Sequence, residues 1–240
     1  MKAMILAAGR GERMRPLTDT RPKPLLTIAE KSLIEYHIEA LVKVGINDIV
    51  INHAWLGEQI EAKLAAGANY GATIQYSREE QALETAGGIK KALSLLGDEA
   101  FVVVNADVFT DFPYGNIVKA CQNLATSHCL AHLILVNNPE HHPDGDFYCQ
   151  NKQVIDPIKH PLEKTLAYTF SGIACYQPTF FSDLDRGKQA LAPMLRSAME
   201  KQQVSGEIYQ GDWWDIGTPQ RLEDLNRRVG TALSAHAEAQ

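Results

Sequence analysis

The sequence KAMILAAGRGERM, residues 2–14, places a short apolar run directly before a glycine-containing loop. Residues 2–7 predict a strand, because a continuous apolar run of this length is typical of a strand buried on both faces of a sheet. Gly9 and Gly11 then predict a turn at the carboxyl end of that strand. In an open parallel sheet this end faces the ligand crevice, so we expect the loop to take part in binding.

Strand and helix patterns alternate from this point along the chain. Ser32-Leu33-Ile34-Glu35 is a capping box, and apolar residues follow it at helical spacing until Gly45, which predicts a helix. Further strands are expected at 49–51, 73–76, 101–104, 129–136, 169–176 and 204–209. Further helices are expected at 56–64, 89–96, 191–199 and from Pro219 onward. The alternation predicts a doubly wound, mostly parallel α/β sheet.

The length of 240 residues fits one domain, which we assign to residues 1–230, with a disordered tail at 231–240. The net charge of −6 argues against general nucleic-acid binding, which requires a basic face. We find no signal peptide and no apolar stretch of about 18 residues, so we expect a cytoplasmic protein without a membrane span. Four scattered cysteines without a Cys-x-x-Cys pair predict reduced thiols.

The loop after the first strand differs from two common nucleotide-binding motifs. Met14 occupies the place of the third glycine in the dinucleotide-binding fingerprint, and the Gly-Lys-Ser/Thr of a P-loop is missing. The loop is nevertheless basic, which suits a polyphosphate, although a structural turn or a solvated surface loop would also look like this. Pro22 and Pro24 stiffen the backbone around Lys23, so that its charge is fixed in place. The cations of the loop are Arg10, Arg13, Arg15, Arg21 and Lys23.

Two aspartates occupy positions where the carboxylates of one ligand site are expected. Asp107 follows the strand at 101–104, at the end that faces the crevice. Asp215 precedes Thr218-Pro219, a typical helix start with threonine as N-cap. Mg²⁺ binds few protein carboxylates and fills its shell with phosphate oxygens and water, so the pair suits this ion. Each aspartate taken alone is equally well explained as a turn or cap residue.

Residues 6–18, LAAGRGERMRPLT, followed by Arg21-Pro22-Lys23-Pro24-Leu25, resemble the signature of the sugar-phosphate nucleotidyltransferases, and the resemblance extends to about Val229. It implies a Rossmann-like nucleotidyltransferase fold with an embedded sugar-binding subregion. It also implies that the partners are a nucleoside triphosphate and a sugar 1-phosphate, with Mg²⁺ as cofactor. Later motifs resemble the short bacterial uridylyltransferases that use UTP and N-acetylmuramate 1-phosphate in peptidoglycan recycling. These motifs are LETAGG (83–88), HHPDGDF (141–147), TFSGI (169–173) and WDIGTP (214–219).

The resemblance also assigns roles to residues. It implies that Arg13 binds the β- and γ-phosphates, that Lys23 binds the α-phosphate, and that Asp107 and Asp215 hold Mg²⁺. The nucleotide-binding residues that it implies are Ala8, Gly9, Gly11, Glu79, Glu80, Gly87, Gly88 and Asn105, with Glu79 or Glu80 accepting a uracil N–H. The sugar-binding residues that it implies are Gly145, Asp146, Ser171, Gly172 and Lys159. Lys159 is included because Asp156-Pro157-Ile158-Lys159 is the nearest segment to the Glu-Lys-Pro that many members carry.

Several alternatives remain open from the sequence. A glucose- or mannose-1-phosphate nucleotidyltransferase would share the motifs, and a non-catalytic regulatory subunit that binds a nucleotide sugar would share the fold. Such a subunit should lack the lysine or an aspartate, which this chain keeps. An acidic muramate would need room and either a cation or amide donors near its carboxylate, and Lys159, His141 and His142 are the candidate cations. The two adjacent histidines are interpreted as part of a polar loop and not as a metal site, because neighbouring side chains face different ways.

Overall fold

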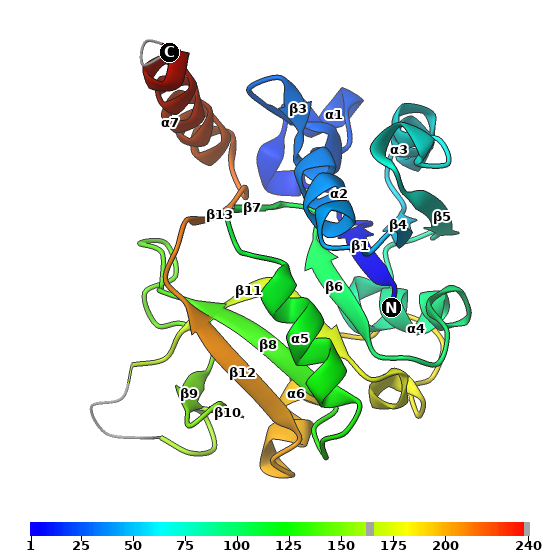
Figure 1. Cartoon of the computed structure of the whole chain (residues 1–240), viewed down its shortest axis with the longest axis vertical. Helices are drawn as coiled ribbons and strands as arrows, with labels where there is room; N and C mark the ends of the chain where they lie inside the picture. Colours follow the sequence, from blue (N-terminus) through cyan, green and yellow to red (C-terminus); the bar gives the residue numbers. More distant parts are fainter. Residues whose placement is uncertain (162–165, 238–240) are drawn as a thin grey trace.

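The computed structural model describes residues 1–161 and 166–237. A nine-stranded sheet forms its centre, in the order β5-β4-β1-β6-β11-β8-β12-β10-β9 (Figure 1). The first four strands in this order are mutually parallel, and β11 is antiparallel to both β6 and β8. The mostly parallel α/β sheet predicted from the sequence is therefore confirmed. The strands are β1 (Ala3–Ala7), β4 (Asp48–His53), β5 (Thr73–Arg78), β6 (Phe101–Asn105), β8 (Ala131–Val136), β9 (Tyr148–Gln150), β10 (Gln153–Ile155), β11 (Thr169–Tyr176) and β12 (Val204–Tyr209).

Helices cover both faces of this sheet (Figure 1). On one face α2 (Leu33–Lys43), α3 (Gly57–Leu64) and α5 (Gly115–Leu124) form one apolar core, and on the other α4 (Glu84–Leu96) and α6 (Leu191–Glu200) form a second. The alternation of strand side chains explains this division, since Ile5 of β1 belongs to the first core and Met4 to the second. The predicted capping box begins α2. In it the Glu35 carboxylate accepts hydrogen bonds from both the backbone N–H and the hydroxyl of Ser32.

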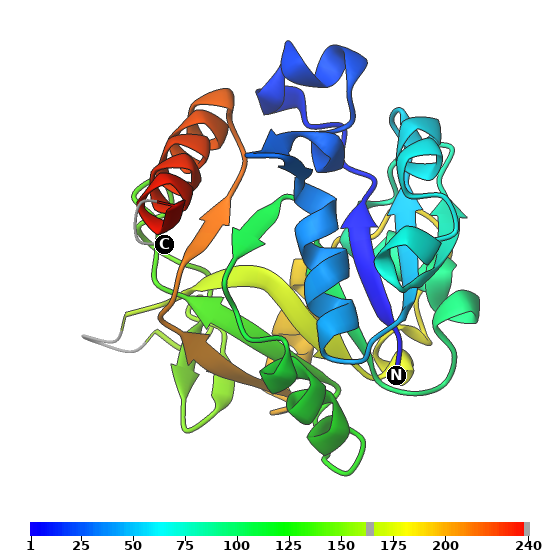
Figure 2. The same cartoon turned by 45° about the horizontal axis from the view of Figure 1, so that its top comes forward.

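A third, smaller core lies at the ligand end of the sheet. The hairpin of β2 (Thr27–Ile28) and β3 (Lys31–Ser32) contributes to it, together with α7 (Pro219–Ala237), which Figure 2 shows apart from the nine-stranded sheet. Met14, which replaces the fingerprint glycine, is buried in this core. We expected a disordered tail from position 231, but α7 continues past this position to Ala237. Alanine and leucine favour helix, which explains this continuation. Residues 238–240 of that tail lie outside the described residues.

Several short elements complete the fold. β7 (Val108–Thr110) pairs antiparallel with β13 (Trp213–Asp215), and neither strand was expected from the sequence. No helix of the described chain is long and apolar enough to cross a membrane. The four cysteines are free thiols, as predicted. The remaining elements are α1 (Leu17–Thr20), η1 (Glu12–Met14), η2 (Lys23–Leu25), η3 (Ala68–Tyr70) and η4 (Pro178–Phe181).

Candidate active site

Two cavities adjoin at the carboxyl ends of β1 and β6. Glu84, Thr85 and Asn105 line both of them, so a molecule in one cavity lies next to a molecule in the other. The first cavity, of about 220 Å³, is lined by Leu6, Ala7, Ala8, Gly9, Lys23, Pro24, Asn52, Ala82, Glu84, Thr85, Asn105, Ala106 and Asp107. The second cavity, of about 470 Å³, is lined by Glu84, Thr85, Asn105, Asp146, Phe147, Phe170, Ala190, Leu191, Ala192 and Leu195.

The two glycines of the loop after β1 serve different purposes. A Cβ at Gly9 would meet nothing within 4 Å, so this residue leaves open space along the wall of the first cavity. Gly11 has a φ of 67°, and a Cβ there would lie 3.1 Å from Thr18, so this residue is required for the tight turn. Arg13 is exposed and has no hydrogen bond or ion pair within residues 1–161 and 166–237. Its guanidinium is thus available to an anion.

The segment from β4 to α3 fixes the rest of this loop. Trp55 donates a hydrogen bond from Nε1 to the carbonyl of Thr18 at 3.0 Å. The guanidinium of Arg10 stacks 3.9 Å from the centre of the Trp55 ring and donates to the same carbonyl at 2.9 Å. Gln59 donates to the carbonyl of Thr20 at 3.0 Å. The basic loop is therefore held by contacts to two of its own carbonyls.

Lys23 and Asp107 form an ion pair in the first cavity. The Nζ atom lies 2.5 Å from Oδ2 of the carboxylate. The lysine side chain is only 11% exposed, whereas the aspartate is 40% exposed and faces the open side. Lys23 opens η2, and Pro22 precedes it in extended conformation, which holds the ammonium in place as the sequence predicted.

The β7–β13 ladder brings Asp215 beside Asp107. The backbone N–H of Ile216 donates to the carbonyl of Asp107 at 2.8 Å. Arg221, in the first turn of α7, has Nη1 2.6 Å and 2.5 Å from the two carboxylate oxygens of Asp215. His141 Nε2 lies 2.8 Å from one of them. Each of the two aspartates thus has a cationic partner, Lys23 in one case and Arg221 in the other.

Asp107 and Asp215 are the two carboxylates that could contribute to a metal site here. No group of three or more histidines, cysteines, aspartates and glutamates that could enclose a metal occurs in residues 1–161 and 166–237. A cation bound by Asp107 and Asp215 would therefore need further ligands from a bound molecule or water. This is the donor set that Mg²⁺ uses with substrate phosphates.

Glu79 is buried and its carboxylate is used within the protein. Oε1 accepts a hydrogen bond from Asn52 at 2.7 Å, and Oε2 accepts one from the backbone of Leu83 at 2.9 Å. Asn52 also accepts the backbone N–H of Ala7 at 3.0 Å, and it lines the first cavity. A Cβ at Gly88 would lie 2.8 Å from both Asn52 and Glu79, so Gly88 makes room for this bond. The sequence did not single out Asn52, the polar side chain that faces the cavity here.

Glu80 and Gly87 also lie outside the lining of the first cavity. Glu80 is exposed. A Cβ at Gly87 would lie 2.2 Å from the carbonyl oxygen of Gly187, and the N–H groups of Ala86 and Gly87 both donate to Gln189 O at 3.1 Å. Gly87 is therefore required for packing the start of α4 against the loop before α6, and the geometry gives no support to a direct ligand contact.

Asp146 is the residue of the predicted sugar-binding group that lines the second cavity. Its Oδ2 accepts the backbone N–H of Phe170 at 2.8 Å, and its Oδ1 lies 3.1 Å from His142 Nε2. Gly145 has a φ of 65°, and a Cβ there would lie 2.7 Å from Asn138. The glycine thus allows the turn that presents Asp146. The adjacent histidines face two different aspartates, as expected for a polar loop.

Ser171 and Gly172 lie at an irregularity in the pairing of β11 with β8. Ser171 is buried, and its hydroxyl accepts a hydrogen bond from the backbone N–H of Ile173. The backbone carbonyl of Ser171 accepts a hydrogen bond from Nε1 of Trp213 at 2.9 Å. Gly172 has a φ of 79°, and a Cβ there would lie 2.7 Å from Nδ2 of Asn105. Gly172 therefore leaves room for Asn105, which lines both cavities, while neither Ser171 nor Gly172 lines either cavity.

Lys159 is not brought to the cavities. It pairs with Glu200 of α6, and it belongs to the lining of neither cavity. Asp156 of the same segment is buried and pairs with Arg196, also of α6. The segment docks on α6, so the geometry does not support the sugar-phosphate contact expected from the sequence.

Glu84 was not predicted as a site residue, although its motif was noted. It has a φ of 60° at the start of α4 and lines both cavities. Such a conformation costs a non-glycine residue roughly 1–3 kcal/mol. Its ion pair with Lys188, 3.4 Å long, joins side chains that are 43% and 68% exposed, and pairs of this kind contribute about 0–1 kcal/mol. This pair alone does not offset the strain.

The fold is that of a known family. The nucleotidyl transferase family model matches residues 2–231. The chain belongs to this family.

Two curated relatives and one solved structure illustrate the match. The N-acetylmuramate α-1-phosphate uridylyltransferase of Neisseria meningitidis serogroup B is 49% identical over 232 residues, which cover 96% of this chain and 99% of the relative. The β catalytic subunit of mannose-1-phosphate guanylyltransferase from Dictyostelium discoideum is 29% identical, and the match covers 91% of this chain but 62% of the relative. A Bacillus anthracis structure, assigned provisionally as a glucose-1-phosphate thymidylyltransferase with a bound sucrose, shares the fold, with a TM-score of 0.82, 23% identity and coverage of 95% and 94%.

Proposed function

We propose that this protein transfers a uridylyl group from UTP to N-acetylmuramate 1-phosphate, giving the UDP-sugar and pyrophosphate. The observation that carries the proposal is the pair of adjoining cavities that share Glu84, Thr85 and Asn105, with Lys23 and Asp107 in the first. The 49% identity to an N-acetylmuramate α-1-phosphate uridylyltransferase over almost the whole of both chains supports the choice of substrates.

The nucleotide occupies the first cavity in this proposal, and the sugar 1-phosphate the second. Lys23 neutralises charge on the α-phosphate, and Arg13 binds the outer phosphates. Asp107 and Asp215 would hold Mg²⁺, which would neutralise phosphate charge when bound. The acceptor phosphate oxygen attacks the α-phosphorus directly and pyrophosphate leaves, so the residues act by positioning and charge stabilisation without a protein nucleophile.

Two other functions are less well supported. The mannose-1-phosphate guanylyltransferase relative is 29% identical and considerably longer, so it favours the shared reaction class more than its own substrates. A non-catalytic regulatory subunit would not need the Lys23–Asp107 pair. It would also not need Arg13, whose guanidinium has no partner within the described residues. We place the reaction in the cytoplasm, within peptidoglycan recycling, which agrees with four free cysteines.

Pyrophosphate release from a substrate panel tests the proposal. UTP, dTTP and GTP are each combined with the 1-phosphates of N-acetylmuramate, N-acetylglucosamine, glucose and mannose. UTP with the muramate should give the highest kcat/KM. Lys23→Ala should lower kcat about 10²–10³-fold, because one preorganised charge aimed at the transition state is lost. A higher kcat/KM for a neutral sugar refutes the acceptor, and more than half the wild-type turnover in Lys23→Ala refutes the role of the lysine.

A further inference from the structure

The second cavity contains no basic side chain among its lining residues. It does contain two carboxylates, and each has a cationic or potentially cationic partner outside the lining. Asp146 is paired with His142, and Glu84 is paired with Lys188. N-acetylmuramate 1-phosphate carries a lactyl carboxylate in addition to its phosphate, so a cation at this cavity would favour its binding over that of a neutral sugar. One of these partners is therefore expected to meet the carboxylate.

The backbone around Lys188 is fixed to the rim of the cavity. The N–H of Gln189 donates to Leu83 O at 2.9 Å, and the carbonyl of Gln189 accepts two N–H groups from the first turn of α4. The chain then continues into Ala190 and Leu191, which line the cavity. Gly87 permits this close approach because it lacks a Cβ. The start of the lysine side chain is thus anchored, while its ammonium is free to move.

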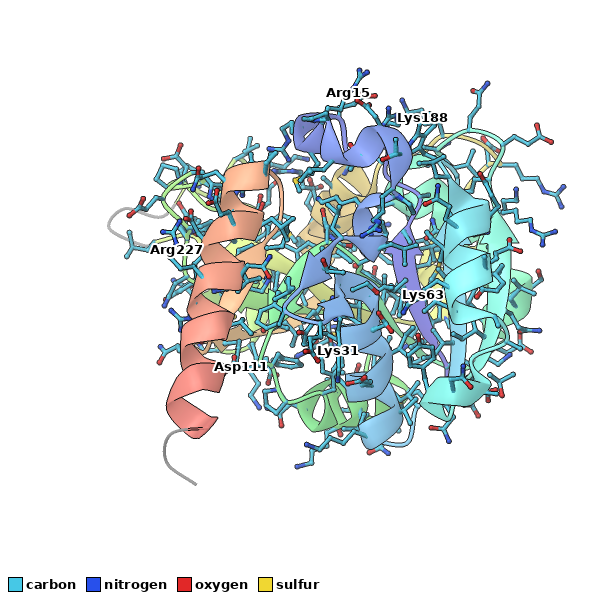
Figure 3. The ribbon with its side chains drawn as sticks, turned by 90° about the horizontal axis from the view of Figure 1, so that it is seen from above. Arg15, Lys31, Lys63, Asp111, Lys188 and Arg227 are labelled. Carbon is cyan, nitrogen blue, oxygen red and sulfur yellow. The ribbon has the colours of Figure 1, made fainter. Side chains whose placement is uncertain are left out.

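The Lys188 side chain is 68% exposed, and in Figure 3 it lies at the periphery of the molecule as seen from above. Glu84 holds the Nζ atom at 3.4 Å. Because the pair is exposed and weak, exchanging the Glu84 carboxylate for one on a ligand costs little.

Three other basic side chains already have partners within the protein. Arg221 contacts both oxygens of Asp215. His142 contacts Asp146, whose second oxygen is fixed by the backbone of Phe170. Lys159 is paired with Glu200 on α6, away from both cavities.

We propose that Lys188, held at the cavity rim by Glu84, is a specificity-determining residue that binds the carboxylate by which N-acetylmuramate 1-phosphate differs from neutral sugar 1-phosphates. The inference rests on the proposed function. Glu84 acts in it as a positioning residue, since its ion pair keeps the ammonium beside the cavity before the ligand carboxylate binds. A salt bridge to a ligand carboxylate of this kind strengthens binding of the acidic sugar alone.

The test compares the kcat/KM for N-acetylmuramate 1-phosphate with that for N-acetylglucosamine 1-phosphate, both with UTP. Lys188→Gln should lower this ratio about tenfold or more, mainly by raising the KM for the muramate. Lys188→Arg keeps the charge and should keep most of the ratio. Lys119→Gln, which removes a lysine from α5 outside both cavities, is the matched control for net charge and should leave the ratio unchanged.

Glu84→Gly provides a second, independent variant. Glycine accepts a φ of 60° without strain, so the Tm should not fall, whereas the selectivity ratio should fall because the ammonium loses its anchor. A wild-type enzyme that prefers the muramate but keeps its ratio in both Lys188→Gln and Glu84→Gly overturns this inference alone. A wild-type enzyme that prefers a neutral sugar overturns the proposed function and this inference together.

Discussion

At the scale of single residues, the site is organised around two aspartates that each have a basic partner. Lys23 contacts Asp107, and Arg221 contacts Asp215. A divalent ion bound by these carboxylates would take over the charge that the two cations now neutralise. Lys23 would then be free to turn toward an anionic ligand, as the proposed mechanism requires.

Asp107→Asn and Asp215→Asn should each weaken metal binding at least about tenfold, because the amide keeps the shape but loses the charge. The measurement is Mn²⁺ binding in the presence of UTP, followed by electron paramagnetic resonance, with pyrophosphate release as a second readout. Asp98→Asn, an exposed aspartate after α4, serves as control. Wild-type Mn²⁺ affinity in both site variants would exclude the shared metal site.

The sequence predicted the residues whose role follows from their place after a strand. Asp107 follows β6 and Gly9 follows β1, so the topology directs both to the crevice, where Asn105, which the family resemblance implied, ends β6. Glu84 could not be predicted, because its importance lies in a backbone angle that depends on how α4 meets a loop about 100 residues later. The expected contact of Lys159 with the sugar phosphate has no support in the geometry for a similar reason, since α6 supplies its partner.

At the scale of elements, most long segments were predictable and most short ones were not. Most of the helices and central strands have apolar periods that identify them, and the capping box of α2 marked its start correctly. The exception is α5, a helix of 10 residues that we did not predict. β7 and β13 have only three residues each and no period of their own. Their pairing, which brings Asp215 to Asp107, depends on tertiary contacts.

The contact between the β4–α3 segment and the glycine loop leads to a prediction at this scale. Trp55→Ala removes both the hydrogen bond to Thr18 and the stacking surface for Arg10, so it should raise the KM for UTP about 5–30-fold with a smaller effect on kcat. Trp55→Phe keeps the ring but loses the N–H and should fall in between.

Steady-state kinetics with varied UTP measure this effect. Gln59→Ala, which removes the second tether, should change the KM in the same direction. Ile158→Ala is a control at an exposed apolar residue outside both cavities. An unchanged KM in Trp55→Ala would show that the loop holds its conformation without the tryptophan.

At the scale of the whole molecule, stability should depend on pH through groups buried in the folded state. Burial, together with the nearby Lys152, lowers the pKa of His132 on β8 to about 4. Burial likewise lowers the pKa of His37 on α2 to about 4, although its hydrogen bond to the Val108 carbonyl acts in the opposite direction. Both side chains therefore remain neutral in the folded protein at pH values where they are protonated in the unfolded chain.

Unfolding by urea should consequently become easier as the pH falls from about 6.5 toward 4. In this window the unfolded state binds protons that the folded state does not, so the free energy of unfolding rises with pH by up to about 1.4 kcal/mol per pH unit for each histidine. Glu35 responds in a lower window. Burial raises the pKa of Glu35, but hydrogen bonds from Ser32 and Tyr70 lower it by more than burial raises it, so that the pKa is about 2. The contribution of Glu35 to stability is therefore lost only as the pH falls below its ordinary pKa of 4.5.

His132→Gln separates these contributions, because it removes one titrating group while keeping a polar side chain opposite Ser205. Urea unfolding of the wild type and the variant at several pH values between 4 and 7.5 gives the two slopes. The variant should take up about one proton fewer on unfolding near pH 5, and the two slopes should agree above pH 7, where His132 is neutral in both states. Equal slopes near pH 5 would mean that His132 is protonated in the folded protein and that its burial does not govern its charge.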